Sequence, residues 1–212
     1  MNGHTYSNAD LSQLDKRFRT NLINSLTGFK SVSLVGTQSS EGEHNLAIFS
    51  QIIHVGANPP LIGILFRPHT VPRHTLENIL DTTFFTINHI RGSFIEQAHQ
   101  TSARWDISEF TGTGLTPESS DEFEAPFVAE ATIKIGLTYV EHYTLQCNKT
   151  VFLVGEIQKV NLPANCIGSD GFVDLVKAES ITCSGLDAYH EVKRPTRLAY
   201  AKPNQPVVSL TD

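Results

Sequence analysis

The chain has 212 residues, 40% of them hydrophobic, and a formal net charge of -6 at pH 7. This length is enough for one large domain with a real core, and we expect a single domain over residues 1–212. The acidic balance and the lack of a Lys/Arg-rich run argue against a nucleic-acid binder. No apolar stretch approaches the ~20 residues of a membrane-spanning helix, and the first residues lack the apolar core of a signal peptide.

The cysteines indicate a reducing compartment. Cys147, Cys166 and Cys183 are widely spaced and form neither a CxxC pair nor a disulfide framework. We therefore expect a cytoplasmic protein with reduced thiols.

The first predicted element is an amphipathic helix over residues 14–28. Gly28 predicts its end, because glycine adopts the left-handed conformation without strain. The apolar residues of one face recur at intervals of four: Leu14, Phe18, Leu22 and Leu26.

Most of the remaining chain favours strands joined by tight turns. We therefore predict a mainly β fold, an antiparallel barrel or sandwich with peripheral helices. Residues 74–81 predict a short helix, and residues 171–176 predict either a strand or a short buried turn. The predicted strands are residues 31–39, two runs within 45–66 separated by Asn58-Pro59-Pro60, 83–88, one long strand over 126–140, and 149–163.

Two stretches depart from this pattern. Residues 91–121 are polar and contain the only tryptophan, Trp105, so we predict an irregular excursion from the barrel. The tail over residues 194–208 has three prolines and is predicted to be extended, on the surface or on another subunit.

Residues 67–79, "RPHTVPRHTLENI", gather cationic and hydroxyl side chains at a helix entrance. Pro72 suits the first helical turn, with Thr70 or Val71 near the N-cap. Free amides and the dipole at a helix N-terminus favour an anion, and Arg67, Arg73, Thr70 and Thr75 add donors. The spacing alone leaves two interpretations open: a phosphate site, or plain capping by Thr70 beside two solvated arginines.

The strand "HNLAIFSQI" carries Asn45 and Ser50 on either side of apolar residues. A planar aromatic ligand could lie against it, with the two polar side chains fixing the edge of the ligand. An ordinary strand with two outward polar positions also fits the pattern and is the commoner case.

Other chemistries find little support. Gly112-Thr-Gly114 lacks the third glycine of a dinucleotide fingerprint, since Pro117 stands there. The nine histidines fit no zinc spacing, so we predict no metal site. Cys147 lies near His142 and Glu141, but a small buried thiol is commoner than a nucleophile. No GxSxG elbow and no recognisable carboxylate pair indicates a hydrolase.

Taken in order, several segments resemble the flavin reductase-like family with the FMN-binding split-barrel fold. The matching segments cover roughly residues 31–160, and the second is the most specific. They read "VSLVGTQSSEGEHNLAIFSQI", "NPPLIGILFRPHTVPRHTLENILDTTFFTIN", "FTGTGLTPE" with "APFVAEATIKI", and "VFLVGEIQKV".

This resemblance implies a six-stranded antiparallel Greek-key barrel that works as a homodimer, with FMN bound non-covalently near the dimer interface. It places the phosphate of FMN at Arg67, Arg73 and Thr75, with Thr70 and His74 nearby. It places the isoalloxazine ring against Ala47, Ile48, Phe49 and Ser50, with Asn45 nearby and Phe66 approaching from the next strand.

The resemblance also implies an oxidoreductase that transfers hydride from NADH or NADPH to flavin and passes electrons to a small-molecule acceptor. Since the flavin carries the chemistry, we name no catalytic side chain. Two alternatives are open. One is an FMN-binding electron carrier or sensor without nicotinamide turnover. The other is a barrel that binds another phosphate-bearing ligand, such as pyridoxal phosphate or a deazaflavin. His142-Tyr143 and the tail receive no role.

Overall fold

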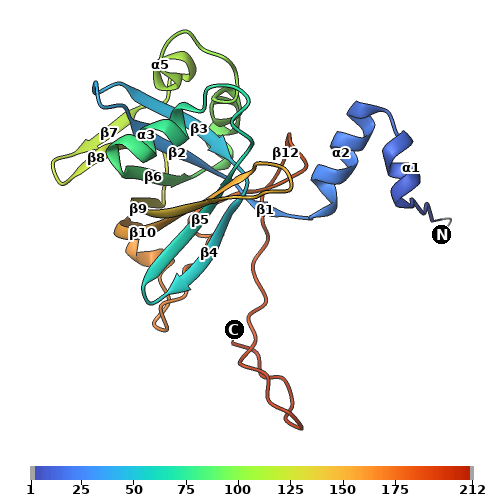
Figure 1. The fold of residues 1–212 in the computed structure, drawn as a ribbon. Coiled ribbons are helices and arrows are strands. Elements are labelled where there is room, and N and C mark those ends of the chain that lie inside the picture. Colours follow the sequence, from blue (N-terminus) through green and yellow to red (C-terminus); the bar gives the residue numbers. More distant parts are fainter. Residues whose placement is uncertain (1–2, 211–212) are drawn as a thin grey trace.

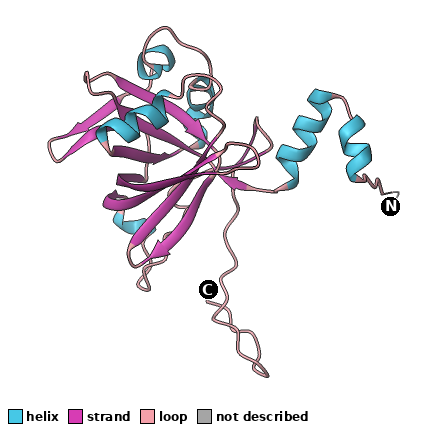
Figure 2. Ribbon diagram, viewed as in Figure 1, coloured by secondary structure: helices cyan, strands magenta, loops and turns pink. Residues whose placement is uncertain are grey.

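A computed structural model of the chain describes residues 3–210. Its centre is a curled antiparallel sheet of seven strands, in the order β3-β2-β6-β9-β10-β5-β4 (Figures 1 and 2). The strands are β2 (Ser33–Gln38), β3 (His44–Phe49), β4 (Ile52–Ala57), β5 (Pro60–Phe66), β6 (Phe84–His89), β9 (Lys134–Thr144) and β10 (Val151–Asn161).

The sheet curls until its two ends meet. β3 and β4 are its edge strands. Phe49 on edge strand β3 meets Phe66 on β5 edge to face, with ring centroids 4.9 Å apart. The N–H of Leu65 donates to the carbonyl of Gln51, in the link between the two edges, over 3.0 Å. The predicted barrel is therefore confirmed, with seven strands in its main sheet in place of six.

Two small sheets complete the β structure. β7 (Pro117–Ser120) pairs with β8 (Phe123–Val128), and the second small sheet has the order β1-β11-β12. Its strands are β1 (Lys30–Ser31), β11 (Thr182–Ser184) and β12 (Ala188–His190).

Helices lie around the barrel. α3 (His74–Thr82) packs against β2 and β3, and its bounds match the predicted residues 74–81 to within one residue. α1 (Asn8–Gln13) and α2 (Lys16–Leu26) project away from the barrel in Figure 1. The remaining helical segments are η1 (Gly92–Phe94), α4 (Ile95–Gln100), α5 (Glu109–Thr113) and η2 (Ala164–Cys166). No helix among residues 3–210 is long and apolar enough to cross a membrane.

Two of the apolar clusters hold most of the elements together. The barrel cluster includes the buried Val35, Ile64, Phe85, Leu137 and Leu153, one from each of five strands. Burying a side chain of this size stabilises the fold by about 1.5–3 kcal/mol. The second cluster lies between β2–β3, helices α4 and α5, and β11.

Three predictions need correction, and the alternative left open for residues 171–176 is decided. The run before Asn58 is two strands, β3 and β4, because the chain bends at Ser50 and Gln51. The long strand over 126–140 is two strands, because a turn closed by the N–H of Ala131 and the carbonyl of Val128 (3.1 Å) ends β8 before β9 begins. Residues 91–121 are mostly short helices and β7, not irregular chain. Of the two alternatives for residues 171–176, the structure shows the turn, in which the Asp174 carboxylate accepts from the N–H groups of Val176 and Lys177.

Candidate functional site

The predicted phosphate loop leads into α3, but the cap of the helix lies later than expected. Its N-cap is Arg73, which makes no side-chain cap hydrogen bond, so the predicted cap at Thr70 or Val71 is wrong. The Glu77 carboxylate reaches back to accept from the Arg73 N–H over 3.0 Å and lies 2.8 Å from His69 Nε2. The Arg73 N–H chiefly lowers the pKa of Glu77, burial opposes this, and His69 adds to the lowering.

Arg73 carries an unusual buried donor. Its Nε is buried and has no hydrogen-bond partner among residues 3–210, and its Nη2 makes one long contact of 3.4 Å with the Pro68 carbonyl. A buried donor without a partner costs about 1–3 kcal/mol. An anion at the start of α3 would supply the missing acceptor and meet the positive end of the helix dipole. The residues present therefore fit a phosphate group.

A polar network joins α3 to the barrel. Asn45 Nδ2 on β3 donates to Thr75 Oγ1 on α3 over 3.0 Å and to Thr37 Oγ1 on β2 over 3.2 Å. Asn78 Nδ2 donates to the same Thr37 oxygen over 3.1 Å. Thr37 and Thr75 are buried. The network fixes the first turn of α3 beside β3, and Thr37 and Asn78 are site residues that sequence reasoning missed.

The predicted ring-binding residues lie along the free edge of the main sheet. Within residues 3–210, β3 pairs only with β2, so its other edge has no partner strand there. α5 covers the start of this edge: Glu109 Oε2 accepts from the Leu46 N–H (3.1 Å), and the Ser108 hydroxyl donates to the His44 carbonyl (2.7 Å). Backbone groups of alternate residues along a strand point to the same side. The N–H and carbonyl of Ile48 therefore point away from β2, as do the Leu46 N–H and the His44 carbonyl. A planar ligand could hydrogen-bond there.

The two sides of β3 meet different neighbours. Ile48 packs with Leu46 against the cluster of α4 and α5, whereas Phe49 packs into the barrel cluster. Phe66 is buried against Phe49, so the structure places it behind the strand, and its contact with a ligand stays a prediction.

Ser50 marks the far end of the edge, beside β11. A hydrogen bond from Ser50 and the charge of Lys30 lower the pKa of the Cys183 thiol, but burial outweighs both and raises it. The thiol is therefore protonated near neutrality, in keeping with a structural role.

The structure thus brings Thr75, Arg73 and Asn45 next to the β3 edge that holds Ala47, Ile48, Phe49 and Ser50. The side chains of Arg67, Thr70 and His74 are exposed around the same loop and helix start. Two surface hollows, of about 420 and 290 Å³, are lined by other residues. Residues 3–210 contain no cluster of three or more His, Cys, Asp or Glu that could hold a metal.

The fold and this site define a split-barrel protein of the flavin-handling type, and the comparisons with known proteins agree. The family model of the flavin reductase like domain matches residues 29–172. The chain therefore belongs to the flavin reductase-like family.

Individual relatives support the same placement. The chain is similar to the crystal structure of a candidate flavin reductase with split barrel domain from Shewanella frigidimarina, at 49% identity and a TM-score of 0.90, over 94% of this chain and 100% of the other. Nitrilotriacetate monooxygenase component B from Bacillus cereus shares the fold, at 20% identity and a TM-score of 0.80, over 93% and 100% of the two chains. An uncharacterized Aquifex aeolicus protein is 32% identical over 49% of this chain, and the match spans only 55% of that relative.

Proposed function

We propose that this flavin reductase-like protein is an FMN-binding oxidoreductase that accepts hydride from NADH or NADPH. The observation that carries the proposal is the buried, unpartnered Nε of Arg73 at the start of α3, next to the open edge of β3. Family membership supports the flavin-related redox function, and the phosphate-fitting donors favour a phosphorylated flavin.

In this proposal the chain binds both ends of FMN, the phosphate and the isoalloxazine ring. Arg73 provides a charge-assisted fork for the phosphate, Thr75 a hydroxyl, and the first amides of α3 the helix dipole. Arg67, Thr70 and His74 surround the phosphate from the exposed side of the loop. Asn45 acts by holding Thr75 in place, through its 3.0 Å hydrogen bond.

The ring would lie along the edge of β3. Backbone groups of Ile48 and Ser50 would meet its polar rim, and Ala47 and Phe49 would shape the adjoining surface. When bound, FMN supplies the hydride acceptor for the nicotinamide and passes electrons on to a small-molecule acceptor. The backbone donors of β3 stabilise negative charge on the rim, because they are fixed in advance by the sheet.

We also propose that the protein is a cytoplasmic homodimer with FMN near the interface. The exposed side chains of Arg67, Thr70 and His74 support this, because a second copy would cover them. The outer face of β4, β5 and β10 adds support: Val55 and Phe152 both lie over Gly63, where an added Cβ would be 3.1 Å from Val55 and 2.3 Å from Phe152. Ile53 and Val55 leave large apolar area on this face exposed.

The test is an anaerobic titration of the purified protein loaded with FMN. NADH or NADPH should bleach the flavin absorption band, and the spectrum should return with oxygen. Bleaching by dithionite but by neither nicotinamide would identify an electron carrier or sensor. Failure to bind FMN, with another phosphate-bearing ligand released from the native protein, would contradict the proposal.

A further inference from the structure

The start of α5 takes the place of a partner strand over the first part of the β3 edge. The Ser108 hydroxyl donates to the His44 carbonyl over 2.7 Å, and Glu109 Oε2 accepts from the Leu46 N–H over 3.1 Å. A neighbouring strand would supply the same kinds of donor and acceptor. Two adjacent side chains of one short segment therefore occupy two successive outward groups of the strand.

Packing holds Glu109 at this edge. The next residue, Phe110, is buried in the cluster that also contains Leu46. The Thr113 hydroxyl donates to the Glu109 carbonyl over 2.7 Å and closes the short helix around it. Glu109 itself is half-buried. Its carboxylate is therefore kept against β3 by the packing of α5 as well as by its own hydrogen bond.

The next outward groups along the edge belong to Ile48. In the described part of the chain, the hydrogen bonds from α5 to the outer edge of β3 end at Leu46. A strand rises about 3.3–3.4 Å per residue, so the amide nitrogens of Leu46 and Ile48 are about 7 Å apart along the edge. The Glu109 carboxylate therefore lies one hydrogen-bonding position away from the groups proposed to meet the flavin ring.

The charge of Glu109 is not neutralised by a cation within residues 3–210, where this side chain forms no salt bridge. The imidazole of His44 lies close by, with its ring centroid 6.1 Å from that of Phe110. Burial lowers the pKa of His44 below 6.5, so this ring is neutral near pH 7. Salt screens a partly buried charge much less than an exposed one. The field of the carboxylate therefore acts on neighbouring groups of the edge.

Reduction of FMN changes the charge on which such a field acts. Hydride transfer from NADH leaves NAD⁺ and carries one proton with two electrons to the flavin, so the ring gains one negative charge. A fixed negative charge nearby disfavours the more negative of two states. The Glu109 carboxylate should therefore destabilise reduced FMN relative to oxidised FMN.

We propose that Glu109 lowers the reduction potential of bound FMN by holding a negative charge beside the isoalloxazine ring. The residue acts through its charge and does not touch the reacting atoms. Reduced FMN is then a stronger electron donor to the small-molecule acceptor. This inference rests on the proposed FMN site, and it adds a residue that tunes the direction of electron flow there.

The first test is an anaerobic redox titration of the full-length, FMN-loaded protein against a dye of known potential, with dithionite as the reductant. Glu109→Gln keeps an oxygen that accepts from the Leu46 N–H but removes the charge. The midpoint potential of FMN should rise by at least about 30 mV, which for a two-electron couple is a tenfold change in the ratio of affinities for reduced and oxidised FMN. A change of less than about threefold in this ratio would overturn the proposal.

Glu109→Asp separates charge from hydrogen bonding. Aspartate keeps the charge on a side chain one methylene shorter, so the hydrogen bond to Leu46 weakens while the charge remains. The affinity ratio should stay within about threefold of wild type. If Glu109 only fastens α5 to β3, the pattern reverses: Glu109→Gln keeps the wild-type potential and Glu109→Asp shifts it. That reversed pattern would overturn the proposal.

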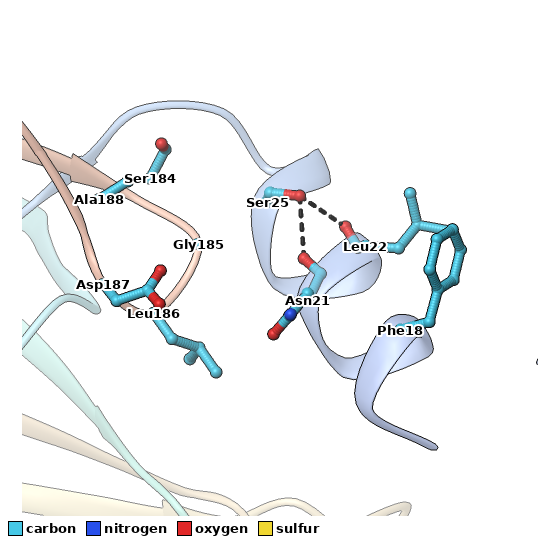
Figure 3. Close-up of a pocket in the computed structure, with 9 residues that line it drawn as sticks. All are labelled: Phe18, Asn21, Leu22, Ser25, Ser184, Gly185, Leu186, Asp187 and Ala188. Atoms are coloured by element: carbon cyan, nitrogen blue, oxygen red, sulfur yellow. Dashed lines mark hydrogen bonds between the residues drawn. The ribbon is translucent and has the colours of Figure 1, made fainter. Parts of the chain in front are cut away.

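Asp15→Asn is the matched control for a change in net charge. The Asp15 carboxylate also accepts from backbone amides, those of Arg17 and Phe18, and asparagine caps a helix as well as aspartate does. The helix that it caps, α2, projects from the barrel in Figure 1 and lines the 420 Å³ hollow in Figure 3, where no β3 residue lies. An equal rise in potential for Asp15→Asn and Glu109→Gln would show an effect of net charge alone and contradict the assigned position.

A binding measurement separates this inference from the proposed function. Fluorescence titration with oxidised FMN, and anaerobic titration with reduced FMN, give the two dissociation constants. Their ratio, reduced over oxidised, should fall about tenfold in Glu109→Gln. A Glu109→Gln variant that no longer folds, or no longer binds oxidised FMN, would show that the charge serves the structure and would overturn the proposal. A wild type that binds no FMN would overturn the proposed function as well, whereas a wild type that binds FMN beside an unshifted variant would overturn the role of Glu109 alone.

Discussion

The side-chain amide of Asn45 lies 3.0 Å from the hydroxyl of Thr75 and connects the edge strand of the barrel to the first turn of α3. The same amide reaches Thr37, which also accepts from Asn78. One buried hydroxyl on β2 therefore sets the position of the helix start relative to the strand edge. This arrangement aligns the proposed phosphate and ring sites before any ligand arrives.

Replacement of Thr37 by valine should test this alignment. The substitution keeps the shape but leaves two amides without their acceptor, so the free energy of unfolding should fall by about 1–3 kcal/mol. FMN affinity should fall as well. Thr144→Val, at an exposed sheet position, is the control and should change stability by less than about 0.5 kcal/mol. Urea unfolding and FMN fluorescence titration give the two values, and unaltered FMN affinity would show that the network serves stability alone.

Arg73→Ala separates ligand binding from fold stability. Removing the guanidinium should weaken FMN binding by about 1.5–3 kcal/mol, the contribution of a charge-assisted hydrogen bond. The free energy of unfolding of the ligand-free protein should stay the same or rise slightly, because the substitution also removes the buried, unpartnered Nε. Arg17→Ala on α2 is the control for general charge effects. Equal FMN affinity of the Arg73 variant and wild type would exclude Arg73 from the phosphate site.

The strands were the most predictable part of this molecule, and the site was predictable only in outline. Runs of strand-favouring residues located β2, β6 and β10, although β2 and β6 are buried on both faces. The break between β8 and β9 was missed, because the alternating pattern continues through the turn at residues 129–133. The N-cap of α3 was missed because Glu77 satisfies the Arg73 N–H from inside the helix, a less common arrangement than a hydroxyl cap.

Contacts between residues far apart in the sequence limited how much of the site could be predicted. Thr37 and Asn78 are 41 residues apart, and no local pattern links them. The Thr-x-x-Asn spacing of Thr75 and Asn78 was visible, but its partner on β2 was not. Arg73 was found through its residue type and loop, whereas its unpartnered nitrogen depends on burial by the folded chain.

Gly155→Ala should test the packing of the barrel interior. A Cβ at this position would lie 2.4 Å from the ring of Phe85, which is fully buried and cannot move aside. Overpacking of this kind costs about 1–3 kcal/mol of unfolding free energy. Gly3→Ala, where nothing lies within 4 Å, should cost less than about 0.5 kcal/mol. Similar unfolding midpoints for the two variants in urea would contradict the close approach.

The thiols should differ in reactivity. Cys147 is exposed, contrary to the predicted buried thiol, whereas Cys166 and Cys183 are buried. Burial also raises the pKa of Cys183 and keeps it protonated. Ellman's reagent at pH 7.5 should therefore label one thiol rapidly in the folded protein and all three after denaturation. Cys147→Ser should abolish the rapid phase; its persistence in that variant would show that a buried cysteine is accessible.

His89 should make the fold sensitive to acid. Burial lowers its pKa to about 4 from 6.5, and Nδ1 lies 2.9 Å from the Ser180 hydroxyl. The unfolded chain binds the proton first as pH falls, so the stabilisation is complete above pH 6.5 and is lost between pH 6.5 and 4. At pH 5 the loss should be roughly 2 kcal/mol.

His89→Asn keeps a hydrogen-bonding group near Ser180 but cannot titrate. Its urea unfolding free energy should therefore fall less than that of wild type between pH 7.5 and pH 5. Carboxylates with lowered pKa, such as Asp170 and Glu77, contribute equally to both proteins, so the difference between the two slopes isolates the histidine. Parallel slopes would show that His89 is protonated in the folded state at pH 5.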